Sequence, residues 1–275
     1  MTRVRHVVLV ILDGLRPDAI SPDRMPALTE LAGRGWSTVA RTVRPSVTVA
    51  ALGSLATGVG PGTHGLDDAR KLPSLPALRR LRPLPTELRR HRLRTAVCTA
   101  ALPRTGELLA RLLLGLAGVG HVSSGGETPG ALGERARRQL QRLAPALGVV
   151  YVNDCDVAGH RHGWMSPPYL RAAALADDAV GALAPMAQAP GTLLLVTADH
   201  GGGGVQVDDH DAPHPLNDHI PLVAAGAMVH HASGHDGASL LDIPPTILDA
   251  LDLPVPAPYE GRVLPLLAAP RAAAA

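Results

Sequence analysis

Histidine and aspartate residues gather in one stretch of this 275-residue chain. Six of the 13 histidines lie between His160 and His219, interleaved with aspartates such as Asp199 and Asp218. Imidazoles and carboxylates without thiolates are the ligands that hydrolytic enzymes use for Zn²⁺, Mn²⁺ or Fe. The cluster therefore predicts a hydrolytic metal site.

Two short motifs within this stretch have the spacing of metal ligands. Asp156 and His160 form D-x-x-G-H after an apolar run, so both can face one cation if the turn, loosened by the intervening glycine, brings them round. Asp199 and His200 directly follow another apolar run. Adjacent residues that leave a strand point apart. This second pair therefore serves either two cations or, once the following glycine run curls, a single one.

A further candidate lies far from this cluster, in residues 44–65. Pro45 and Ser46 form a turn, and Thr48 then stands at the start of a small-residue helix. Free N–H groups and the helix dipole favour an anion or an ionised oxygen at such a position. On this segment alone, N-capping by Ser46 or Thr48 is the simpler interpretation.

Short apolar runs that alternate with helical patterns must position these residues. The runs cover 7–12, 95–98, 148–152, 192–197 and 220–224, with a weaker run at 119–122, and the helical patterns cover 25–34, 49–57, 75–92, 107–116, 132–144, 169–186 and 245–251. Such runs are typical of strands buried on both faces. They predict a doubly wound, mostly parallel α/β sheet with helices on both faces. We expect one catalytic domain over 1–275, without a large cap domain and with a frayed tail over 268–275.

Acidic residues stand at the carboxyl ends of three of these predicted strands. Asp13 closes the first strand, Asp156 follows the run over 148–152, and Asp199 follows the run over 192–197. Because ligands of a doubly wound sheet gather at the carboxyl ends of its strands, we expect the three side chains to meet at one edge.

The composition excludes several other classes of protein. Hydrophobic residues make up 46% of the chain and charged residues 18%, so the chain is neither disordered nor a coiled coil. Aromatic residues make up only 2%, which disfavours binding of nucleic acid by base stacking. No stretch approaches the roughly 20 apolar residues of a membrane span. We therefore expect neither a nucleic-acid scaffold nor a membrane as partner.

Charge and cysteine content add little further specificity. The formal net charge of +2 does not imply a polyanionic partner. Residues 70–94 hold nine basic residues and one acidic one, but a solvated arginine face is a simpler interpretation than a phosphate or nucleic-acid site. Cys98 and Cys155 form neither a disulfide framework nor a cysteine zinc motif, so we expect a reducing, cytoplasmic location. The oligomeric state is not predictable from these features.

The motifs occur along the chain in a characteristic order. A strand ending in DG is followed by P-S-V-T, by TG nine residues later and then by HG, and after these come D-x-x-G-H and a strand ending in DHG. In this order the chain resembles the alkaline phosphatase superfamily, most closely its type I phosphodiesterase and nucleotide pyrophosphatase branch. The resemblance covers residues 7–266, including IPLVAAG from Ile220 and DIPPTILDALDLP from Asp242.

The resemblance implies a site with two divalent metal ions, with Zn²⁺ as the first choice and Mn²⁺ as the alternative. The residues that match the first metal site are Asp13, Thr48, Asp199 and His200, and those that match the second are Asp156, His160 and a later histidine. Thr48 matches the nucleophile. Two cations about 4 Å apart can activate a hydroxyl and neutralise the leaving oxygen of a phosphoryl group.

The later histidine has two candidates. In the resembled family this residue precedes the I-P of the next strand by about ten residues, and His210 stands ten before Ile220, whereas His214 stands six before it. The prolines beside His214 also stiffen its backbone. We therefore expect His210 to be the metal ligand and His214 to line the pocket as a phosphate contact or leaving-group acid, although both could be solvated loop residues.

One position departs from the resembled branch, whose members often have an asparagine three residues beyond the nucleophile. The chain has Ala51 there, so we expect Arg44, Arg41 or backbone N–H groups to clamp the phosphate instead. The expected function is hydrolysis of a small phosphorylated substrate, a phosphodiester or a phosphomonoester, through a phosphothreonine intermediate. The alternatives are a metal-dependent phosphomutase, a phosphonate hydrolase, and a non-catalytic metal-binding member, for which Ala51 is the support.

Overall fold

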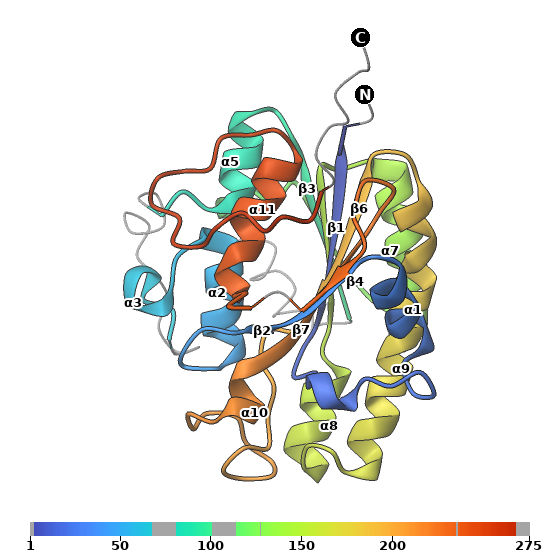
Figure 1. The fold of residues 1–275 in the computed structure, drawn as a ribbon. Coiled ribbons are helices and arrows are strands. Elements are labelled where there is room, and N and C mark those ends of the chain that lie inside the picture. Colours follow the sequence, from blue (N-terminus) through green and yellow to red (C-terminus); the bar gives the residue numbers. More distant parts are fainter. Residues whose placement is uncertain (1–2, 68–80, 101–113, 127, 235, 268–275) are drawn as a thin grey trace.

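Strand β1 (His6–Leu12) lies near the middle of a mostly parallel sheet in the computed structural model, which describes residues 3–67, 81–100, 114–126, 128–234 and 236–267 (Figure 1). Within these residues eight strands follow the order β4-β3-β5-β1-β6-β7-β2-β8. The other strands are β2 (Trp36–Arg41), β3 (Thr95–Thr99), β4 (His121–Ser124), β5 (Leu147–Val152), β6 (Thr192–Thr197), β7 (His219–Ala225) and β8 (Ala232–Ser233).

The central strands are parallel and buried on both faces. β1 pairs in parallel with β5 and with β6. Every residue of β1 after His6 is buried, as are all residues of β6. β7 is antiparallel to both β6 and β2. The predicted strands over 7–12 and 192–197 therefore agree with the structure to within one residue.

Helices cover both faces of this sheet. In Figure 1, α2, α5 and α11 lie on one face, and α1, α7 and α9 lie on the other. The helices are η1 (Pro17–Ala19), α1 (Pro26–Arg34), α2 (Thr48–Thr57), α3 (Pro61–His64), α5 (Leu84–Arg90), α7 (Pro129–Leu143), α8 (Asp154–His162), α9 (Pro167–Leu183), η2 (Ala184–Gln188), α10 (Pro215–Asp218), η3 (Leu240–Asp242) and α11 (Ile243–Ala250). The predicted doubly wound α/β fold is confirmed. None of these described helices is long and apolar enough to cross a membrane.

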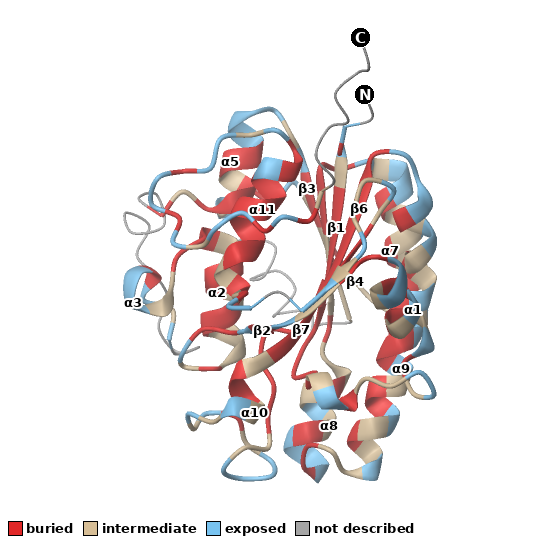
Figure 2. Ribbon diagram, in the orientation of Figure 1, coloured by how far each residue is buried: buried red, intermediate tan, exposed pale blue. Residues whose placement is uncertain are grey.

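Aliphatic side chains and close helix contacts build the core, because the chain has no phenylalanine. The sheet and the inward faces of the helices form one continuous hydrophobic core (Figure 2). Helix α9 brings Ala172, Ala173, Ala176 and Ala179 to this interior. At Gly133 of α7 an added Cβ would lie 2.8 Å from the Cα of Ala179, so the two helices approach closely there.

Several elements differ from the sequence prediction. β2 was not predicted, because only Trp36 and Ala40 of this strand are buried while Val39 is 52% exposed. The helix expected over 75–92 begins at Leu84 in the described residues, after Pro83. The remainder of that prediction, and most of the one over 107–116, falls outside the described residues.

Candidate active site

The three predicted strand ends meet at one edge of the sheet. Asp13 follows β1, Asp156 lies in the first turn of α8 directly after β5, and Asp199 follows β6. The backbone N–H of Asp156 donates to the carbonyl of Asp13 at 3.0 Å, which fixes the two chain segments together. This is the end of the molecule where α8 and α10 lie in Figure 1.

The D-x-x-G-H motif is helical, which corrects the expectation of a glycine-loosened turn. Asp156 and His160 lie one turn apart on α8, with Asp156 Oδ1 3.4 Å from His160 Nε2. Gly159 has a packing role instead. A Cβ at this position would lie 2.5 Å from the ring of Trp164, so only glycine lets the indole lie against the helix.

A first group of side chains surrounds His200. Its Nε2 lies 3.2 Å from Asp13 Oδ1, 3.7 Å from Asp199 Oδ2 and 3.0 Å from Thr48 Oγ1. The other Asp199 oxygen accepts hydrogen bonds from the backbone N–H groups of Gly14 and His200. Asp199 and His200 therefore point at the same place, as expected if both serve a single cation.

Burial and charge perturb the titration of this first group. Burial, reinforced by the charge of Asp13, raises the pKa of the Asp199 carboxyl well above its ordinary value. Burial also acts to raise the pKa of Asp13, but the nearby ring of His200 outweighs burial and lowers it. Burial opposes a charged imidazole, yet Asp199 and Asp13 raise the pKa of His200 to about 10. The carboxylates and the imidazole of this group therefore titrate as one coupled cluster.

A second group consists of Asp156, His160 and His210. Nε2 of His210 lies 3.1 Å from Nε2 of His160 and 3.7 Å from Asp156 Oδ1. Two ligand atoms on one tetrahedral ion with bonds of about 2.0 Å lie about 3.3 Å apart, so this spacing fits a shared cation. Burial, with the nearby charge of His200, lowers the pKa of His210 to about 4, so His210 is neutral at pH 7 and able to bind a metal.

All three histidines are oriented in the same way. Their Nδ1 atoms lie at hydrogen-bond distance from backbone carbonyls: His200 from Gly201 at 2.8 Å, His210 from Ser46 at 2.8 Å and His160 from Asp208 at 2.9 Å. A proton on each Nδ1 leaves each Nε2 as the free ligand atom. This arrangement, a ring N–H donating to a carbonyl behind the ligand nitrogen, is how proteins fix metal-binding histidines.

Some carboxylate oxygens at the site also lack hydrogen-bond donors within the described part of the chain, which indicates a metal site. Three buried oxygens have no hydrogen-bond donor in the described residues: Asp13 Oδ1, Asp156 Oδ1 and Asp199 Oδ2. Two sets of ligand atoms each lie within 4.8 Å of one another, one from Asp13, Asp199 and His200 and one from Asp156, His200 and His210. Buried acceptors without donors are costly unless a cation satisfies them. The donor set therefore fits divalent metal ions.

The hydroxyls of Ser46 and Thr48 do not cap helix α2, so the N-capping interpretation is wrong. The N-cap residue is Val47, which forms no side-chain capping bond. Ser46 Oγ donates to the carbonyl of His210 at 2.9 Å. Thr48 Oγ1 instead lies against His200 Nε2, at the first residue of the helix and beside the carboxylate cluster.

The two predicted substrate contacts lie near this site but outside the ligand groups. Arg44 is engaged by the buried carboxylate of Asp218, and its side chain is 60% exposed. His214 stands at the N-cap of α10, where its Nδ1 accepts from the backbone N–H of Leu216 at 3.1 Å. Both assignments to the substrate stay predictions.

Tyr151 is the site residue that sequence reasoning missed. It lies in β5, and its hydroxyl donates to Asp13 Oδ2. A tyrosine in an otherwise apolar run is the available signal. Trp164 and Tyr169, for which the sequence left open a place at the mouth of the site or packing over the loop at His162, both donate to the carbonyl of Gly14, at 2.9 Å each, and so hold the turn after Asp13.

The two histidine candidates can be separated by substitution. His210→Ala should lower the metal affinity of the second group by more than about 100-fold, since losing even a hydrogen-bonding partner of a ligand costs about 10- to 100-fold. His214→Ala should leave both metal sites filled. Metal content after dialysis against a weak chelator measures this. Loss of one ion in the His214 variant alone would reverse the assignment.

Tyr151→Phe should weaken metal binding at the first group by about 10- to 100-fold, because Asp13 loses the hydrogen bond that orients it. The metal-dependent rise in melting temperature and a calorimetric titration report this loss without any assay of activity. Tyr259→Phe is the matched control, since its hydroxyl donates to the carbonyl of Arg82, remote from the site. Equal affinities in the two variants would remove Tyr151 from the site.

Comparison with known proteins agrees with this architecture. The family model for type I phosphodiesterase / nucleotide pyrophosphatase matches residues 7–70 and 120–247. A 2,3-bisphosphoglycerate-independent phosphoglycerate mutase from Thermosynechococcus vestitus is 31% identical over 144 residues, which cover 49% of this chain and 27% of that protein. The corresponding mutase of a Cyanothece species is 36% identical over 129 residues, 43% of this chain and 24% of that protein. The chain thus spans about a quarter of the length of these relatives.

Solved structures share the fold at low sequence identity. A protein in the alkaline phosphatase superfamily from Vibrio parahaemolyticus superposes with a TM-score of 0.69 and 17% identity, over 94% of this chain and 69% of that one. Murine ectonucleotide pyrophosphatase / phosphodiesterase 5 gives a TM-score of 0.68 and 15% identity, over 92% of this chain and 96% of that one. Because the family model covers well over half of the residues, the chain belongs to the type I phosphodiesterase / nucleotide pyrophosphatase family.

Proposed function

We propose that the chain hydrolyses phosphoric esters of small molecules through Thr48 as nucleophile, with a phosphothreonine intermediate. The observation that carries this proposal is the position of Thr48 Oγ1, 3.0 Å from His200 Nε2 and at the first residue of α2. This hydroxyl caps no helix and lies beside buried carboxylate oxygens that lack hydrogen-bond donors among the described residues. Its position supports a role in the reaction rather than in helix stability.

Thr48 and the first N–H groups of α2 have different roles in the proposed reaction. Thr48 Oγ1 forms a bond to phosphorus as the ester oxygen departs. Water then breaks the bond between Thr48 and phosphorus, which releases phosphate from a monoester or a phosphomonoester from a diester. The first N–H groups of α2 have no acceptor within the helix and lie at its positive end, which favours the anionic phosphoryl group. Two divalent ions, when bound, would activate the hydroxyl and neutralise the phosphoryl oxygens.

Zn²⁺ is the ion that we propose for both groups, with Mn²⁺ as the alternative. Asp13, Asp199, His200 and Thr48 would hold one ion, and Asp156, His160 and His210 the other. Nitrogen and carboxylate ligands without thiolates suit both metals. Elemental analysis of protein purified without chelator should find close to two such ions per chain.

A second candidate function is a phosphomutase, which the two mutase relatives favour. In a mutase the phosphothreonine returns its phosphoryl group to a hydroxyl of the substrate, whereas in a hydrolase it passes to water. The matches cover about a quarter of each mutase, and we therefore prefer hydrolysis. A phosphonate monoester hydrolase from Silicibacter pomeroyi has the same fold, with a TM-score of 0.66, so phosphonates belong in the substrate screen.

The fate of the phosphoryl group separates these functions. The metal-loaded protein should be incubated with a phosphomonoester, a phosphodiester and a phosphonate in H₂¹⁸O, with and without glycerol as an acceptor. Hydrolysis predicts ¹⁸O in the phosphorus-containing product, which is inorganic phosphate from the phosphomonoester, a phosphomonoester from the diester and a phosphonic acid from the phosphonate ester. Transfer to glycerol or to a second substrate hydroxyl in preference to water would favour the mutase, and turnover of no ester by metal-loaded protein would indicate the non-catalytic alternative.

The cellular location also stays a proposal. We place the reaction in the cytoplasm, and the observation that Cys98 and Cys155 are free and buried supports a reducing compartment. Alkylation of the unfolded protein, isolated under conditions that preserve disulfides, would detect both thiols if this is right.

A further inference from the structure

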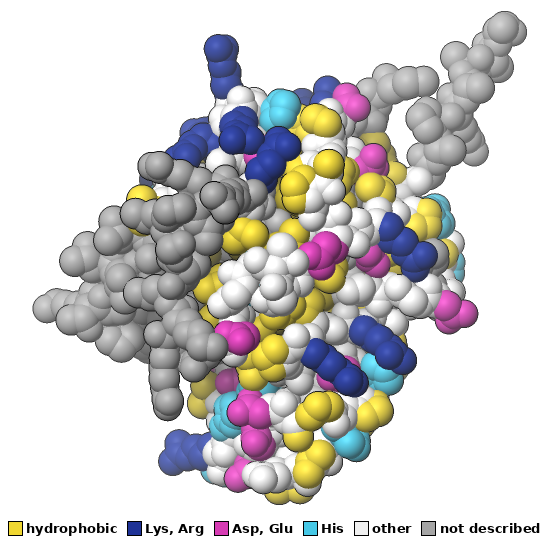
Figure 3. Space-filling view, turned by 90° about the vertical axis from the view of Figure 1, so that its left-hand side faces the viewer, with side chains coloured by type: hydrophobic (Ala, Val, Ile, Leu, Met, Phe, Trp, Pro, Cys, Tyr) yellow, Lys and Arg dark blue, Asp and Glu magenta, His cyan; other side chains and the backbone are white. Residues whose placement is uncertain are grey.

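An arginine-lined cleft lies at the end of the sheet opposite to the active site. It has a volume of about 620 Å³ and is lined by six basic residues, Arg3, Arg5, His6, His91, Arg92 and Arg94. His6 begins β1 and Asp13 follows its end, so the two sites are about 23 Å apart at roughly 3.3 Å per residue. In Figure 3, Lys and Arg side chains gather at the upper end of the face shown, where α5 and the N-terminus lie in Figure 1.

Two Arg-x-Arg segments form the walls of this cleft. Arg3 and Arg5 precede β1, and Val4 between them is buried. Arg92 and Arg94 precede β3, with the half-buried Leu93 between them. Residues 3–5 lead directly into β1, where alternate residues share a face, so burial of Val4 turns Arg3 and Arg5 outward. Arg92 and Arg94 are both exposed.

The space between these walls has the width of a small anion. β1 and β3 each pair with β5, so the segments that precede them are two strand spacings apart, about 10 Å. Ala144 and Ala146, which precede β5, line the cleft with short side chains. Guanidinium groups on both walls can thus reach one ligand between them.

The positive charge of the cleft is largely uncompensated. Among the described residues no carboxylate lines it, and the nearby Asp252 pairs with Arg3 at 3.1 Å. Arg94 donates to the carbonyl of Leu143. In the described part of the chain, the side chains of Arg5 and Arg92 form neither an ion pair nor a hydrogen bond, so their donors are available to a ligand.

The backbone at Arg92 has a left-handed conformation. Arg92 has φ of +60°, a conformation that favours glycine. It follows the end of α5, where Leu93 N donates to Leu88 O at 2.9 Å, and glycine is the usual residue at such a helix end.

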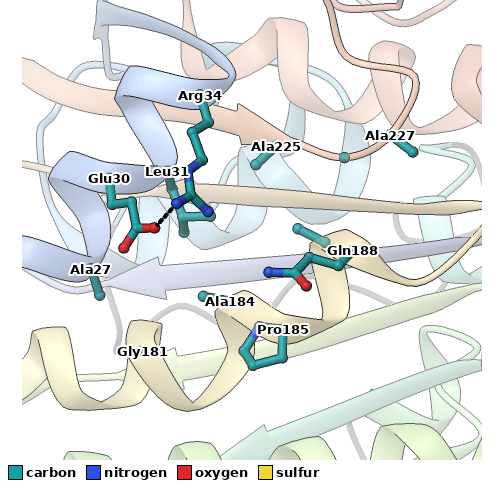
Figure 4. A pocket seen from close by; sticks show the side chains of 12 residues that line it. Ala27, Glu30, Leu31, Arg34, Gly181, Ala184, Pro185, Gln188, Ala225 and Ala227 are labelled. Carbon is teal, nitrogen blue, oxygen red and sulfur yellow. Dashed lines mark ion pairs between the residues drawn. The ribbon is translucent and has the colours of Figure 1, made fainter.

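A second cavity of the molecule gives a useful contrast. The pocket of about 410 Å³ between α1, η2 and the end of β7 also contains an arginine, Arg34, but this side chain is paired with Glu30 at 2.5 Å (Figure 4). Alanine residues line much of that pocket. It presents no free charge, whereas the arginine-lined cleft does.

We propose that the arginine-lined cleft binds a small, multiply charged phosphate-bearing anion. Guanidinium forks match phosphate oxygens in pairs, and a volume of this size suits a small molecule. Histidines supply the aromatic rings in its lining, so base stacking contributes little and a compact oligophosphate fits better than a nucleic acid. This site is separate from the proposed catalytic function and does not depend on it.

Calorimetric titration of the full chain with trimetaphosphate tests this proposal. The titration is run on metal-loaded and on chelated protein at 0.1 M salt, with sulfate at equal ionic strength and a single-stranded RNA oligonucleotide as further arms. We expect saturable binding of trimetaphosphate with the same affinity in both protein forms and weaker binding of sulfate. Binding only to the metal-loaded protein would place the probe at the active site and overturn the proposal.

Variants locate the binding. The double variant Arg5→Ala/Arg92→Ala should weaken trimetaphosphate binding at least tenfold, and Arg5→Lys/Arg92→Lys should weaken it less because the charge remains. Arg138→Ala/Arg171→Ala removes two exposed arginines outside the cleft and should change nothing. Equal loss in this control pair, or RNA bound more tightly than trimetaphosphate, would contradict the proposal. The retained response of melting temperature to metal shows that each variant folds.

Discussion

Thr48→Ala is expected to reduce kcat for the best ester substrate by at least about 10³-fold, since removal of a nucleophile abolishes the covalent step. The fold should persist, because Thr48 is only half-buried and caps no helix end. Metal content should stay close to that of the wild type, since carboxylates and imidazoles provide most of the ligands. Stopped assays with a chromogenic phosphoester, together with elemental analysis, measure both quantities.

Two neighbouring variants sharpen this test. Thr48→Ser keeps a hydroxyl at the same place and should retain measurable turnover and a trappable phosphoenzyme. Ser46→Ala removes a hydroxyl two residues away that donates to the carbonyl of His210, so it should cost no more than about tenfold in rate, the equivalent of one hydrogen bond. If Thr48→Ala stayed fully active while Ser46→Ala lost activity, the nucleophile would be Ser46.

Much of the framework was predictable because it depends on local patterns. β1 and β6 are buried on both faces and therefore appear as uninterrupted apolar runs. Because ligands gather at the carboxyl ends of the strands in such a sheet, the sequence also predicts that Asp13, Asp156 and Asp199 lie at one edge. β2 was missed because it is a strand through its pairing with β7, whose residues are 178 to 188 positions away in the sequence, and not through its own composition.

The details of the site depend on contacts that no local pattern contains. Helix α8 has a weakly apolar sequence, and its first turn is fixed by the hydrogen bond from Asp156 to the carbonyl of Asp13. The glycines after His200 were expected to let the loop curl. Gly203 does have φ of +75°, but Gly202 is required because a Cβ there would lie 2.1 Å from Trp164. Such roles follow from residues distant in sequence, so spacing alone could not assign them.

Asp199→Asn should have opposite effects on the metal-loaded and the metal-free protein. With metal, the variant loses a carboxylate ligand, and the metal affinity of the first group should fall by at least about 100-fold. This loss is larger than the loss of affinity caused by removing a residue that only hydrogen-bonds to a ligand. Without metal, burial and the charge of Asp13 raise the pKa of this residue, so it keeps its neutral form and its O–H to a higher pH than an aspartate in water does. Asparagine has nearly the same shape and offers an N–H₂ group in place of that O–H.

The pH dependence of stability provides the decisive control for this interpretation. In the unfolded chain an aspartate titrates near pH 4, whereas Asp199 in the folded, metal-free protein holds its proton to a higher pH. At this residue the folded state therefore binds more protons than the unfolded state above about pH 4, so the contribution of Asp199 to the stability of the metal-free wild type falls as pH rises through this window. Asparagine does not titrate, so metal-free Asp199→Asn should be as stable as the wild type near pH 4 and more stable near pH 7.

Urea unfolding with chelator present, repeated across this range, measures the difference. A metal-free variant that is less stable than the wild type at pH 7 would show that Asp199 is ionised and stabilising in the absence of metal, and that the cluster does not require a cation.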